Sequence, residues 1–405
     1  MYLIVSLEHR FSRTPDGSIW TDIVFSHSFW RRYLEVFDHV KVMARVQDVA
    51  QVSGDWERSD GECVTFVPLP YYVGPWQYVK HLPQIKRAIN ATLNENAAIL
   101  LRVASPIADL IQPILRHSGR PYGVEVVGDP YDVFAPGTIK HPLRPFFRWW
   151  FSRQLRKQCA TAVAAAYVTA QALQKRYPTA SGVYTTHYSS IELPRSTIVA
   201  HPRDFLTNQN RIRLIFIGTL TQLYKAPDIL IDAVANCVCD GLDLSLTIVG
   251  DGKYRTALEE RTAARNIQQR VTFLGMLPSG EAVYQQLDQA DIFVLPSRAE
   301  GLPRAMIEAM ARGLPCIGST VGGIPELLPA EDMVPPGDIA ALAHKIREVV
   351  ADPERMARMS ARNLEQAREY DKNILDRRRR AFYSYVRQQT IAWIERQVKS
   401  CEYYN

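Results

Sequence analysis

Short apolar runs that alternate with helix-length segments along most of the chain constrain its fold more than any other feature. A first series of strand-like runs lies at 2–7, 39–46, 63–70, 97–103, 122–128 and 164–170. A second series lies at 212–220, 244–252, 270–277, 291–297 and 313–320, with helical patterns between them at 226–238, 254–266 and 281–290. Near-continuous apolar strands joined by helices favour parallel sheets covered on both faces. We therefore predict an α/β fold with doubly wound sheets.

The length of the chain and its turn-rich middle predict two domains. A chain of 405 residues is long for one compact core, and the polar segment 193–213 separates the two series of strands. We predict domains at 1–200 and 201–370, followed by a long charged helix at 371–405. Ligands of doubly wound sheets bind at the carboxyl ends of the strands.

Composition and cysteine spacing argue against several classes of protein. The hydrophobic share is 47% and the charged share 22%, as in ordinary soluble proteins, and no run approaches the roughly 18 apolar residues of a membrane span. Residues 1–10 lack a basic stretch and favour a buried strand over a secretory signal. The six cysteines show no metal-ligand spacing, and no nucleic-acid-binding motif is present. We predict a cytoplasmic protein with no nucleic-acid partner.

The segment 296–315, "PSRAEGLPRAMIEAMARGLP", is predicted to turn from a strand into a helix. Pro303 fits the first helical position, where no backbone donor is lost, and Gly313 fits just past the helix end. The backbone amides around Gly301 and Leu302 are then expected at the mouth of the helix. Unpaired amides at a helix start bind anions, so this turn predicts a site for a diphosphate.

The same segment carries two glutamates eight positions apart, Glu300 and Glu308. Burying a carboxylate is costly unless it is hydrogen-bonded, and an ionised carboxylate only accepts hydrogen bonds. Glu300 therefore suits the hydroxyl groups of a sugar, and Glu308 suits the diol of a ribose. The alternative interpretation is structural, with Glu300 capping the helix and Glu308 paired with an arginine.

A lysine follows a glycine turn in the segment 216–233, "FIGTLTQLYKAPDILIDA". At such a turn Lys225 can act as a point charge against phosphate; the alternative is a solvated loop lysine. A second turn, Gly250-Asp251-Gly252, lacks the third glycine of a dinucleotide fingerprint and is a weak nicotinamide signal. Gly275 ends a predicted strand where backbone groups can hold a base edge.

The ordered runs "LIFIGTL", "VGDG", "VTFLG", "DIFVLPS" and "EGLPRAMIEAMARGLPCIGSTVGGIPELL" resemble family 4 of the retaining glycosyltransferases, which has the GT-B fold. The resemblance is strong over about 212–338 and holds only in outline in the first half. It implies two Rossmann-like domains facing each other across a cleft. The first (1–200) would bind the acceptor and the second (201–370) a nucleotide-sugar, with the helix 371–405 packing back towards the first.

The family's E-x7-E pair maps onto Glu300, which would contact the donor sugar, and Glu308, which would hold the ribose. Its phosphate-binding pattern G-R-x5-K matches Gly218 and Lys225, but Thr219 stands in place of the arginine, a bidentate phosphate ligand. The resemblance therefore implies a set of donor contacts: Gly218, Thr219, Lys225, Gly275, Glu300, Gly301, Leu302 and Glu308.

In the first half the family often has a histidine after a central strand, where this chain has "VEVVGDPYD". Asp129 is our candidate there for a sugar or acceptor contact, and it joins Glu300 and Lys225 as a predicted catalytic residue. The alternative is a turn residue before Pro130. The loop after the first strand should border the cleft, which makes three residues acceptor-side candidates: Asp16, Gly17 and Ser18.

The segment 144–158 predicts a basic amphipathic helix in a region, 133–191, that has no Asp or Glu. On a helical wheel one face carries Phe147, Trp150, Phe151 and Leu155, and the other carries Arg148, Ser152, Arg153, Arg156 and Lys157. Such a helix suits peripheral contact with an anionic membrane, here the inner face of the cell membrane. The alternative is an aromatic face packed on the sheet and a solvated basic face. The arginine run 377–380 either adds to this contact or is a solvated helix face.

The resemblance predicts an enzyme, a retaining glycosyltransferase of the hexosyltransferase type. Its partners would be a nucleotide-diphosphate sugar and a saccharide or lipid-linked acceptor in bacterial surface polysaccharide synthesis. No cofactor is predicted, and no metal, because the chain has no Asp-x-Asp site and a helix dipole with a lysine can replace a divalent ion. Two alternatives stay open: an inactive GT-B homologue that only binds a partner, and a nucleotide-sugar epimerase.

Overall fold

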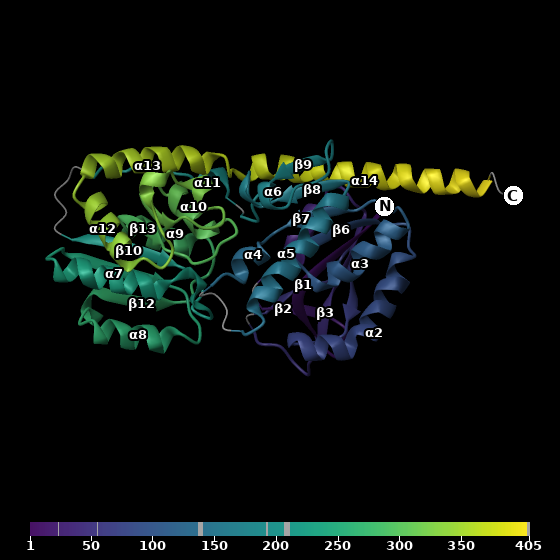
Figure 1. Ribbon diagram of the computed structural model, residues 1–405, viewed down its shortest axis with the longest axis horizontal. Coiled ribbons are helices and arrows are strands. Elements are labelled where there is room, and N and C mark those ends of the chain that lie inside the picture. The colour runs from purple at the N-terminus through teal and green to yellow at the C-terminus, as the bar shows by residue number, and fades with distance from the viewer. Residues whose placement is uncertain (23, 55, 137–140, 192, 206–210, 403–405) are drawn as a thin grey trace. The chain divides into compact units, whose positions relative to one another are not determined.

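The computed structural model describes residues 1–405 except 23, 55, 137–140, 192, 206–210 and 403–405 (Figure 1). The chain divides into two compact units. Unit 1 consists of Met1–Gly128, Phe151–Tyr188 and Asp376–Asn405. Unit 2 consists of Asp129–Trp150 and Ser189–Leu375. Each unit is built around one twisted parallel sheet, as the alternating apolar runs predict.

Unit 1 has a parallel sheet in which β1 lies between β3 and β6. In spatial order its strands are β5 (Val64–Leu69), β3 (His39–Asp48), β1 (Tyr2–Arg13), β6 (Ala98–Val103), β7 (Gly123–Val126), β8 (Ala164–Tyr167) and β9 (Tyr184–His187). Leu3, Ile4 and Val5 of β1 are almost completely buried, because helices cover both faces of the sheet. The register pairs Leu3 with Val40 of β3 and with Ala98 of β6.

The helices of unit 1 come from three segments of the chain. They are α1 (His27–Leu34), α2 (Gly74–Leu93), α3 (Pro106–His117), the later part of α5 (Arg144–Thr161) and α6 (Ala172–Arg176), together with most of α14 (Lys372–Glu402). At the start of α3 the Ser105 hydroxyl accepts a hydrogen bond from the Ala108 amide, and Pro106 occupies the first turn. The buried face of α3 packs into the main core of unit 1.

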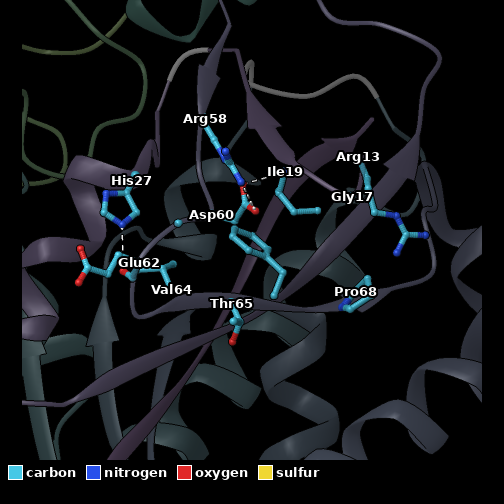
Figure 2. A pocket seen from close by; sticks show the side chains of 12 residues that line it. Arg13, Gly17, Ile19, His27, Arg58, Asp60, Glu62, Val64, Thr65 and Pro68 are labelled. Atoms are coloured by element: carbon cyan, nitrogen blue, oxygen red, sulfur yellow. Dashed lines mark hydrogen bonds and ion pairs between the residues drawn. The ribbon is translucent and has the colours of Figure 1, made fainter. Parts of the chain in front are cut away.

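A small antiparallel addition extends β1. The strand β2 (Ile19–Thr21) pairs with the carboxyl end of β1, and β4 (Glu57–Arg58) pairs with β2. Both added strands border a cavity of about 730 Å³. Figure 2 shows the polar groups at this cavity, with Arg58 paired with Asp60 and the His27 ring hydrogen-bonded to the Glu62 carbonyl. We call this the hairpin cavity.

The helix α14 packs on unit 1, which confirms the predicted return of this helix to the N-terminal domain. Phe382, Tyr383 and Val386 are fully buried, and the Val386 side chain lies directly on the backbone of Gly123 in β7. The sequence pattern predicted the helix from about 371, and its first residue is Lys372.

The contact between α14 and the sheet contains a buried charged cluster around Glu125 of β7. Three tyrosine hydroxyls donate to its carboxylate: Tyr33 at 2.8 Å, Tyr188 at 2.7 Å and Tyr383 at 2.9 Å. Arg102 of β6 adds an ion pair at 2.5 Å. A buried carboxylate is tolerated because its lone pairs are hydrogen-bonded and its charge is balanced. We call these five residues the Glu125 cluster.

Unit 2 has a sheet in which every pair of neighbouring strands is parallel. Its spatial order is β12 (Val271–Gly275), β11 (Leu244–Val249), β10 (Ile212–Ile217), β13 (Ile292–Leu295), β14 (Cys316–Ser319) and β15 (Met333–Val334). Its helices are α4 (Pro130–Val133), α7 (Pro227–Cys239), α8 (Arg255–Ala264), α9 (Glu281–Gln289), α10 (Arg304–Ala311), α11 (Ile324–Leu327), α12 (Ile339–Val350) and α13 (Pro353–Arg368), with the start of α5. Short 3₁₀ turns are η1 (Arg195–Thr197), η2 (Leu223–Lys225), η3 (Gln268–Arg270) and η4 (Ala330–Asp332).

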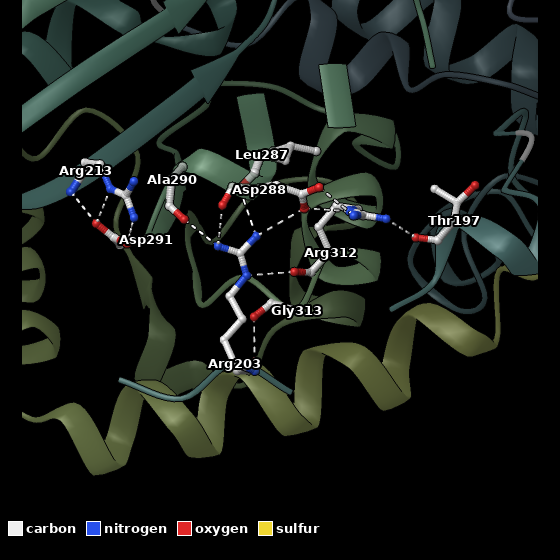
Figure 3. Close-up of polar contacts among 10 residues, drawn as sticks. Thr197, Arg203, Arg213, Leu287, Asp288, Ala290, Asp291, Arg312 and Gly313 are labelled. Carbon is white, nitrogen blue, oxygen red and sulfur yellow. Dashed lines mark hydrogen bonds and ion pairs between the residues drawn. The ribbon is translucent and has the colours of Figure 1, made fainter. Parts of the chain in front are cut away.

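Much of the polar segment 193–213, which was predicted as a linker, is hydrogen-bonded to the rest of unit 2 (Figure 3). The Arg203 guanidinium donates to the carbonyls of Leu287 (2.9 Å), Ala290 (2.5 Å) and Arg312 (2.9 Å). Arg312 in turn donates to the Thr197 carbonyl at 2.8 Å. Arg203 thus satisfies carbonyls at the ends of α9 and α10, where helices leave acceptors unpaired, and Arg312 holds the turn η1.

Candidate active site

The predicted phosphate lysine and the first predicted glutamate meet in unit 2. Lys225 ends the turn η2 before α7, and Glu300 lies in the loop between β13 and α10. The Lys225 ammonium is 2.7 Å from Glu300 Oε1, and both side chains are mostly buried, with 14% and 7% exposed. The Ser297 hydroxyl donates to the same oxygen at 2.9 Å. This contact argues against a solvated loop lysine at 225 and places two predicted donor contacts side by side.

An arginine in the same loop fixes the two segments relative to each other. Arg298 pairs with Asp228 in the first turn of α7 through two bonds of 2.9 and 2.7 Å. It also donates to the Leu223 carbonyl of η2 at 2.7 Å. A bidentate guanidinium–carboxylate pair gives a defined geometry, so Arg298 holds the turn that carries Lys225 against the loop that carries Glu300.

Two glycines are required by close approaches at this point. A Cβ on Gly218 would lie 2.3 Å from Cδ of Lys225, so the lysine side chain crosses the turn over this residue. Gly322 has a φ of +54°, and a Cβ there would lie 1.9 Å from the Glu300 carbonyl oxygen. Glycine at these positions lets the backbone and Lys225 pack closely around Glu300.

Glu308 lies about one turn into α10 and is half-buried. Burial raises the pKa of its carboxyl group, an effect that the charge of Arg304 partly offsets. Within the described residues the side-chain carboxylate of Glu308 makes neither a hydrogen bond nor an ion pair. The alternative interpretation, in which Glu308 forms an ion pair with an arginine, therefore does not agree with the structure. A half-buried carboxylate with both oxygens available can accept hydrogen bonds from a diol.

The mouth of α10 differs slightly from the expected form. Pro303 is the N-cap, with φ −74° and ψ 107°, and the helix begins at Arg304, so Pro303 precedes the first helical position. In the described part of the chain the amides of Gly301 and Leu302 donate no backbone hydrogen bond. Glu300 does not cap the helix, because its carboxylate bonds to Lys225 and Ser297 instead. The amides at this helix start therefore suit an anion.

Two other predicted donor contacts lie on neighbouring turns of unit 2. Thr219 follows β10, and its hydroxyl is 2.8 Å from that of Thr221. Gly275 ends β12 with a φ of +77°, and its carbonyl accepts a hydrogen bond from the Gly250 amide. Both turns follow the carboxyl ends of parallel strands, the edge at which such sheets bind ligands. Their roles as donor contacts stay predictions.

The candidates of the first half have local structural contacts. Asp129 is the N-cap of α4 and accepts a hydrogen bond from the Tyr131 amide at 2.9 Å. Asp16 closes the turn between β1 and β2 by accepting from the amide and hydroxyl of Ser18, and Gly17 lines the hairpin cavity. Hydrogen bonds from Thr14 and Ser18 lower the pKa of Asp16 to about 2. The structure therefore brings Asp16, Gly17 and Ser18 together, and their contact with an acceptor stays a prediction.

The predicted faces of the basic helix are partly wrong. Ser152, placed on the solvent face, is buried together with Leu155, whereas Trp150 is 39% exposed. The helical phase places an additional aromatic stripe outside, with Phe146 50% exposed and Trp149 55% exposed. The helix therefore exposes aromatic and basic side chains together, whereas the sequence predicted them on opposite faces. Among the described residues, the helices are all too short or too polar to span a bilayer.

Sequence reasoning missed two residues that shape the site, Ser297 and Arg298. Both lie in the quoted segment "PSRAEG", and Asp228 lies in "KAPD". The available signal was an acidic residue in the first turn of α7 and an arginine next to Glu300. Pairing them requires knowing that β10 and β13 are neighbours in the sheet, as the structure shows.

Comparison with known proteins agrees with this geometry. Residues 211–352 match the family described as glycosyl transferases group 1. Protein CapJ of Staphylococcus aureus is 27% identical over 330 residues, which are 81% of each chain. A GDP-mannose-dependent monoacylated alpha-(1-6)-phosphatidylinositol monomannoside mannosyltransferase of Corynebacterium glutamicum is 33% identical over 52% of this chain and 59% of its own.

Solved structures share the fold over nearly the whole chain. Sucrose-phosphate synthase of Thermosynechococcus elongatus superposes with a TM-score of 0.67 at 16% identity and covers 99% of both chains. HepE of Anabaena, solved with UDP and glucose, gives a TM-score of 0.62 at 16% identity over 93% of this chain and 97% of its own. The predicted GT-B fold is confirmed.

The class of protein follows from the fold, the site and these matches. Residues 211–352 match the group 1 glycosyl transferases, and the predicted enzyme class, a glycosyltransferase, is confirmed.

Proposed function

We propose that the protein transfers a sugar, with retention of configuration, from a nucleotide-diphosphate sugar to a saccharide or lipid-linked acceptor. The observation that carries the proposal is the contact between Lys225 and Glu300 at the mouth of α10, with the unpaired carboxylate of Glu308 about one turn into the helix. A cation for phosphate on the turn η2 then lies beside an acceptor for sugar hydroxyls in the loop before α10, and an acceptor for a diol follows on α10 itself.

Each group has one role in this proposal. Glu308 accepts hydrogen bonds from the ribose diol, Lys225 and the amides of Gly301 and Leu302 bind the diphosphate, and Glu300 accepts from hydroxyls of the sugar. Positioning and electrostatic stabilisation are the main means by which such a site lowers a barrier. Lys225 and the amides stabilise the negative charge that develops on the leaving group.

The chemical step needs no nucleophile from the protein. The bond between the anomeric carbon and the diphosphate oxygen breaks, and the acceptor oxygen bonds to the same carbon on the same face. The acceptor proton passes to an oxygen of the departing diphosphate. This mechanism is supported by the resemblance of the site segments to retaining enzymes. Asp129 is proposed as an additional sugar or acceptor contact.

The names of similar proteins support the classes of donor and acceptor. The Corynebacterium relative is named as GDP-mannose-dependent and acts on a phosphatidylinositol monomannoside, and HepE was solved with UDP and glucose. We propose a nucleotide-diphosphate sugar as donor, a glycolipid or growing surface polysaccharide as acceptor, and the inner face of the cell membrane as the place of reaction. Exposed Phe146, Trp149 and Trp150 of α5 support peripheral membrane contact.

A thermal-shift panel with UDP, GDP, ADP and their sugar conjugates tests the donor site. A ligand that binds only the folded protein raises its apparent melting temperature. We expect one nucleotide to give a clear shift that is reduced in Lys225→Ala and in Glu308→Gln. Lys345→Ala is the matched control, because Lys345 lies on α12 and pairs with Glu348. Absence of any shift in the wild type would contradict the proposal and favour an inactive homologue.

Two further measurements test the chemistry with the nucleotide found in this way. Proton NMR of the first product formed should show the same anomeric configuration as the donor, whereas an inverted product would contradict retention. We also propose that the reaction needs no metal and no cofactor. Addition of EDTA should leave the rate unchanged, and loss of activity that Mg²⁺ or Mn²⁺ restores would contradict metal independence.

A further inference from the structure

Unit 1 contains a second cavity, of about 520 Å³, at the carboxyl ends of β1 and β3. This volume lies within the roughly 300–1,000 Å³ of small-molecule sites. Its lining comes from β1, the end of β3 and the segments around residues 56 and 71. The polar and aromatic lining residues are Glu8, His9, Arg10, Phe11, Ser12, Asp22, Arg45, Gln47, Trp56 and Tyr71. We call it the bulge cavity.

The wall of the bulge cavity is an irregularity of the sheet. Along β1 and β3 the register jumps from Ser6 opposite Met43 to Arg10 opposite Arg45, so β1 uses two more residues than its partner. Glu8 and His9 lie in this bulge. Bulges redirect side chains and occur often beside active sites, and the carboxyl edge of a parallel sheet is where ligands bind.

The polar wall is held in place before any ligand binds. Glu8 accepts hydrogen bonds from the Ile107 amide (3.0 Å) and the Ser105 hydroxyl (3.1 Å) at the start of α3. Arg45 pairs with Glu8 at 3.1 Å and donates to the Tyr72 carbonyl at 3.0 Å. Side chains fixed in this way lose little entropy when a ligand arrives, which favours binding.

The charges of the bulge cavity cancel. Two carboxylates, of Glu8 and Asp22, and two guanidinium groups, of Arg10 and Arg45, line it. Burial lowers the pKa of His9 to about 4, although the charge of Asp22 opposes this, so the ring is neutral at pH 7. An anion requires an excess of cations, whereas a hydroxyl-rich neutral ligand requires donors and acceptors together. The rings of Trp56 and Tyr71 add flat apolar surface for the face of a sugar.

We propose that the bulge cavity binds a neutral sugar ring of the acceptor. The assignment rests on the proposed function and names the acceptor chemistry: a polyhydroxylated, uncharged ring rather than an acidic sugar or a phosphate. It also moves the acceptor contacts from the turn Asp16–Ser18 to the bulge of β1 and to Arg10 and Gln47 beside it.

Direct binding tests this proposal without the transfer reaction. Saturation-transfer NMR on the full chain is run with methyl α-glucoside, methyl α-mannoside, maltose, N-acetylglucosamine, glucuronic acid and inorganic phosphate as probes. We expect at least one neutral sugar to bind the wild type, and its signal to fall at least tenfold in Gln47→Leu and in Arg10→Ala. The matched control is Thr65→Val, which alters the hairpin cavity instead. Thermal melting confirms that each variant is folded.

The outcomes separate this proposal from the proposed function. Equal sugar signals in all variants, no neutral sugar binding to the wild type, or a preference for glucuronic acid or phosphate would overturn the bulge-cavity assignment. If the sugar binds as expected but no nucleotide raises the melting temperature, the result would support the bulge cavity as a sugar site. It would count only against the proposed donor site.

Discussion

At the scale of single residues, the ammonium of Lys225 and the carboxylate of Glu300 pair with each other when no donor is bound. Lys225 and Glu300 form a mostly buried ion pair, yet the proposed function gives each a different partner on the nucleotide-sugar. The diphosphate must therefore compete with Glu300 for the lysine. A group that assists the reaction can in this way weaken the binding of the free nucleotide.

Glu300→Gln should separate these two effects. The variant keeps the shape of the side chain but removes its charge, so transfer should fall by roughly two orders of magnitude or more. Binding of the sugar-free nucleotide diphosphate should become about fivefold tighter, equivalent to about 1 kcal/mol for an ion pair that no longer competes. Isothermal titration calorimetry measures the affinity, with Ser297→Ala as a control that keeps the charge. Weaker nucleotide binding in Glu300→Gln would show that Glu300 helps to hold the nucleotide.

The sequence predicted these residues unevenly. Glu300, Glu308 and Lys225 stand in segments whose turn and helix signals are local, so their positions followed from spacing and resemblance. Arg298 could not be assigned in the same way, because its partner Asp228 is 70 residues away and meets it only across neighbouring strands. Asp16 and Ser18 were predicted from the position of a loop, and they hydrogen-bond to each other within that turn.

At the scale of elements, the Glu125 cluster determines how α14 is held on unit 1. Tyr383 is the cluster's hydrogen-bond donor from that helix. Tyr383→Phe removes one hydrogen bond to a charged group and should lower the free energy of unfolding by about 1.5–3 kcal/mol. Tyr385→Phe is the matched control, because Tyr385 lies on the same helix and its ring stacks on Tyr184 of β9. Urea unfolding measures both variants, and equal losses would argue against a special role of the cluster.

The same cluster predicts a pH dependence. Burial acts to raise the pKa of Glu125, but Arg102 and the three tyrosine hydroxyls lower it by more, so the folded pKa lies below its usual value. A lowered carboxyl pKa stabilises the fold above the unfolded value of about 4.3 and loses this effect as the pH falls through the folded pKa. The difference in stability between wild type and Tyr383→Phe should therefore be full at pH 7 and shrink below about pH 4. A constant difference would contradict an ionised Glu125.

The aromatic stripe of α5 is the element that tests membrane contact. Replacing both Trp149 and Trp150 with serine removes large exposed apolar surface and should weaken binding to phosphatidylglycerol vesicles at least tenfold, because each buried aromatic contributes about 1.5–3 kcal/mol. Trp76→Ser is the matched control, since Trp76 is 87% exposed on α2. Vesicle sedimentation measures binding. Equal binding of the double variant and the wild type would remove α5 from the contact.

At the scale of the whole molecule, periodicity was sufficient for the class of fold. Each apolar run of the two predicted series became a strand, because buried parallel strands are apolar along their whole length. The strands β2, β4, β9 and β15 were not predicted. They are two to four residues long, and pairing with longer neighbours rather than their own sequence makes them strands. The phase of α5 was also missed, because aromatic residues on both sides gave no single apolar face.

Unit 1 combines three separate segments of the chain, and this has a consequence for synthesis on the ribosome. Glu125 and Tyr383 are 258 residues apart in the chain, which corresponds to roughly 13–50 seconds of translation at about 5–20 residues per second. During that interval the sheet surface that Phe382 and Val386 later cover has no partner. Unit 2, whose main segment is continuous from 189 to 375, can complete its sheet first. A nascent chain of this protein should therefore acquire its folded units in the reverse of their order of synthesis, and the uncovered sheet of unit 1 should be the surface that a ribosome-associated chaperone binds.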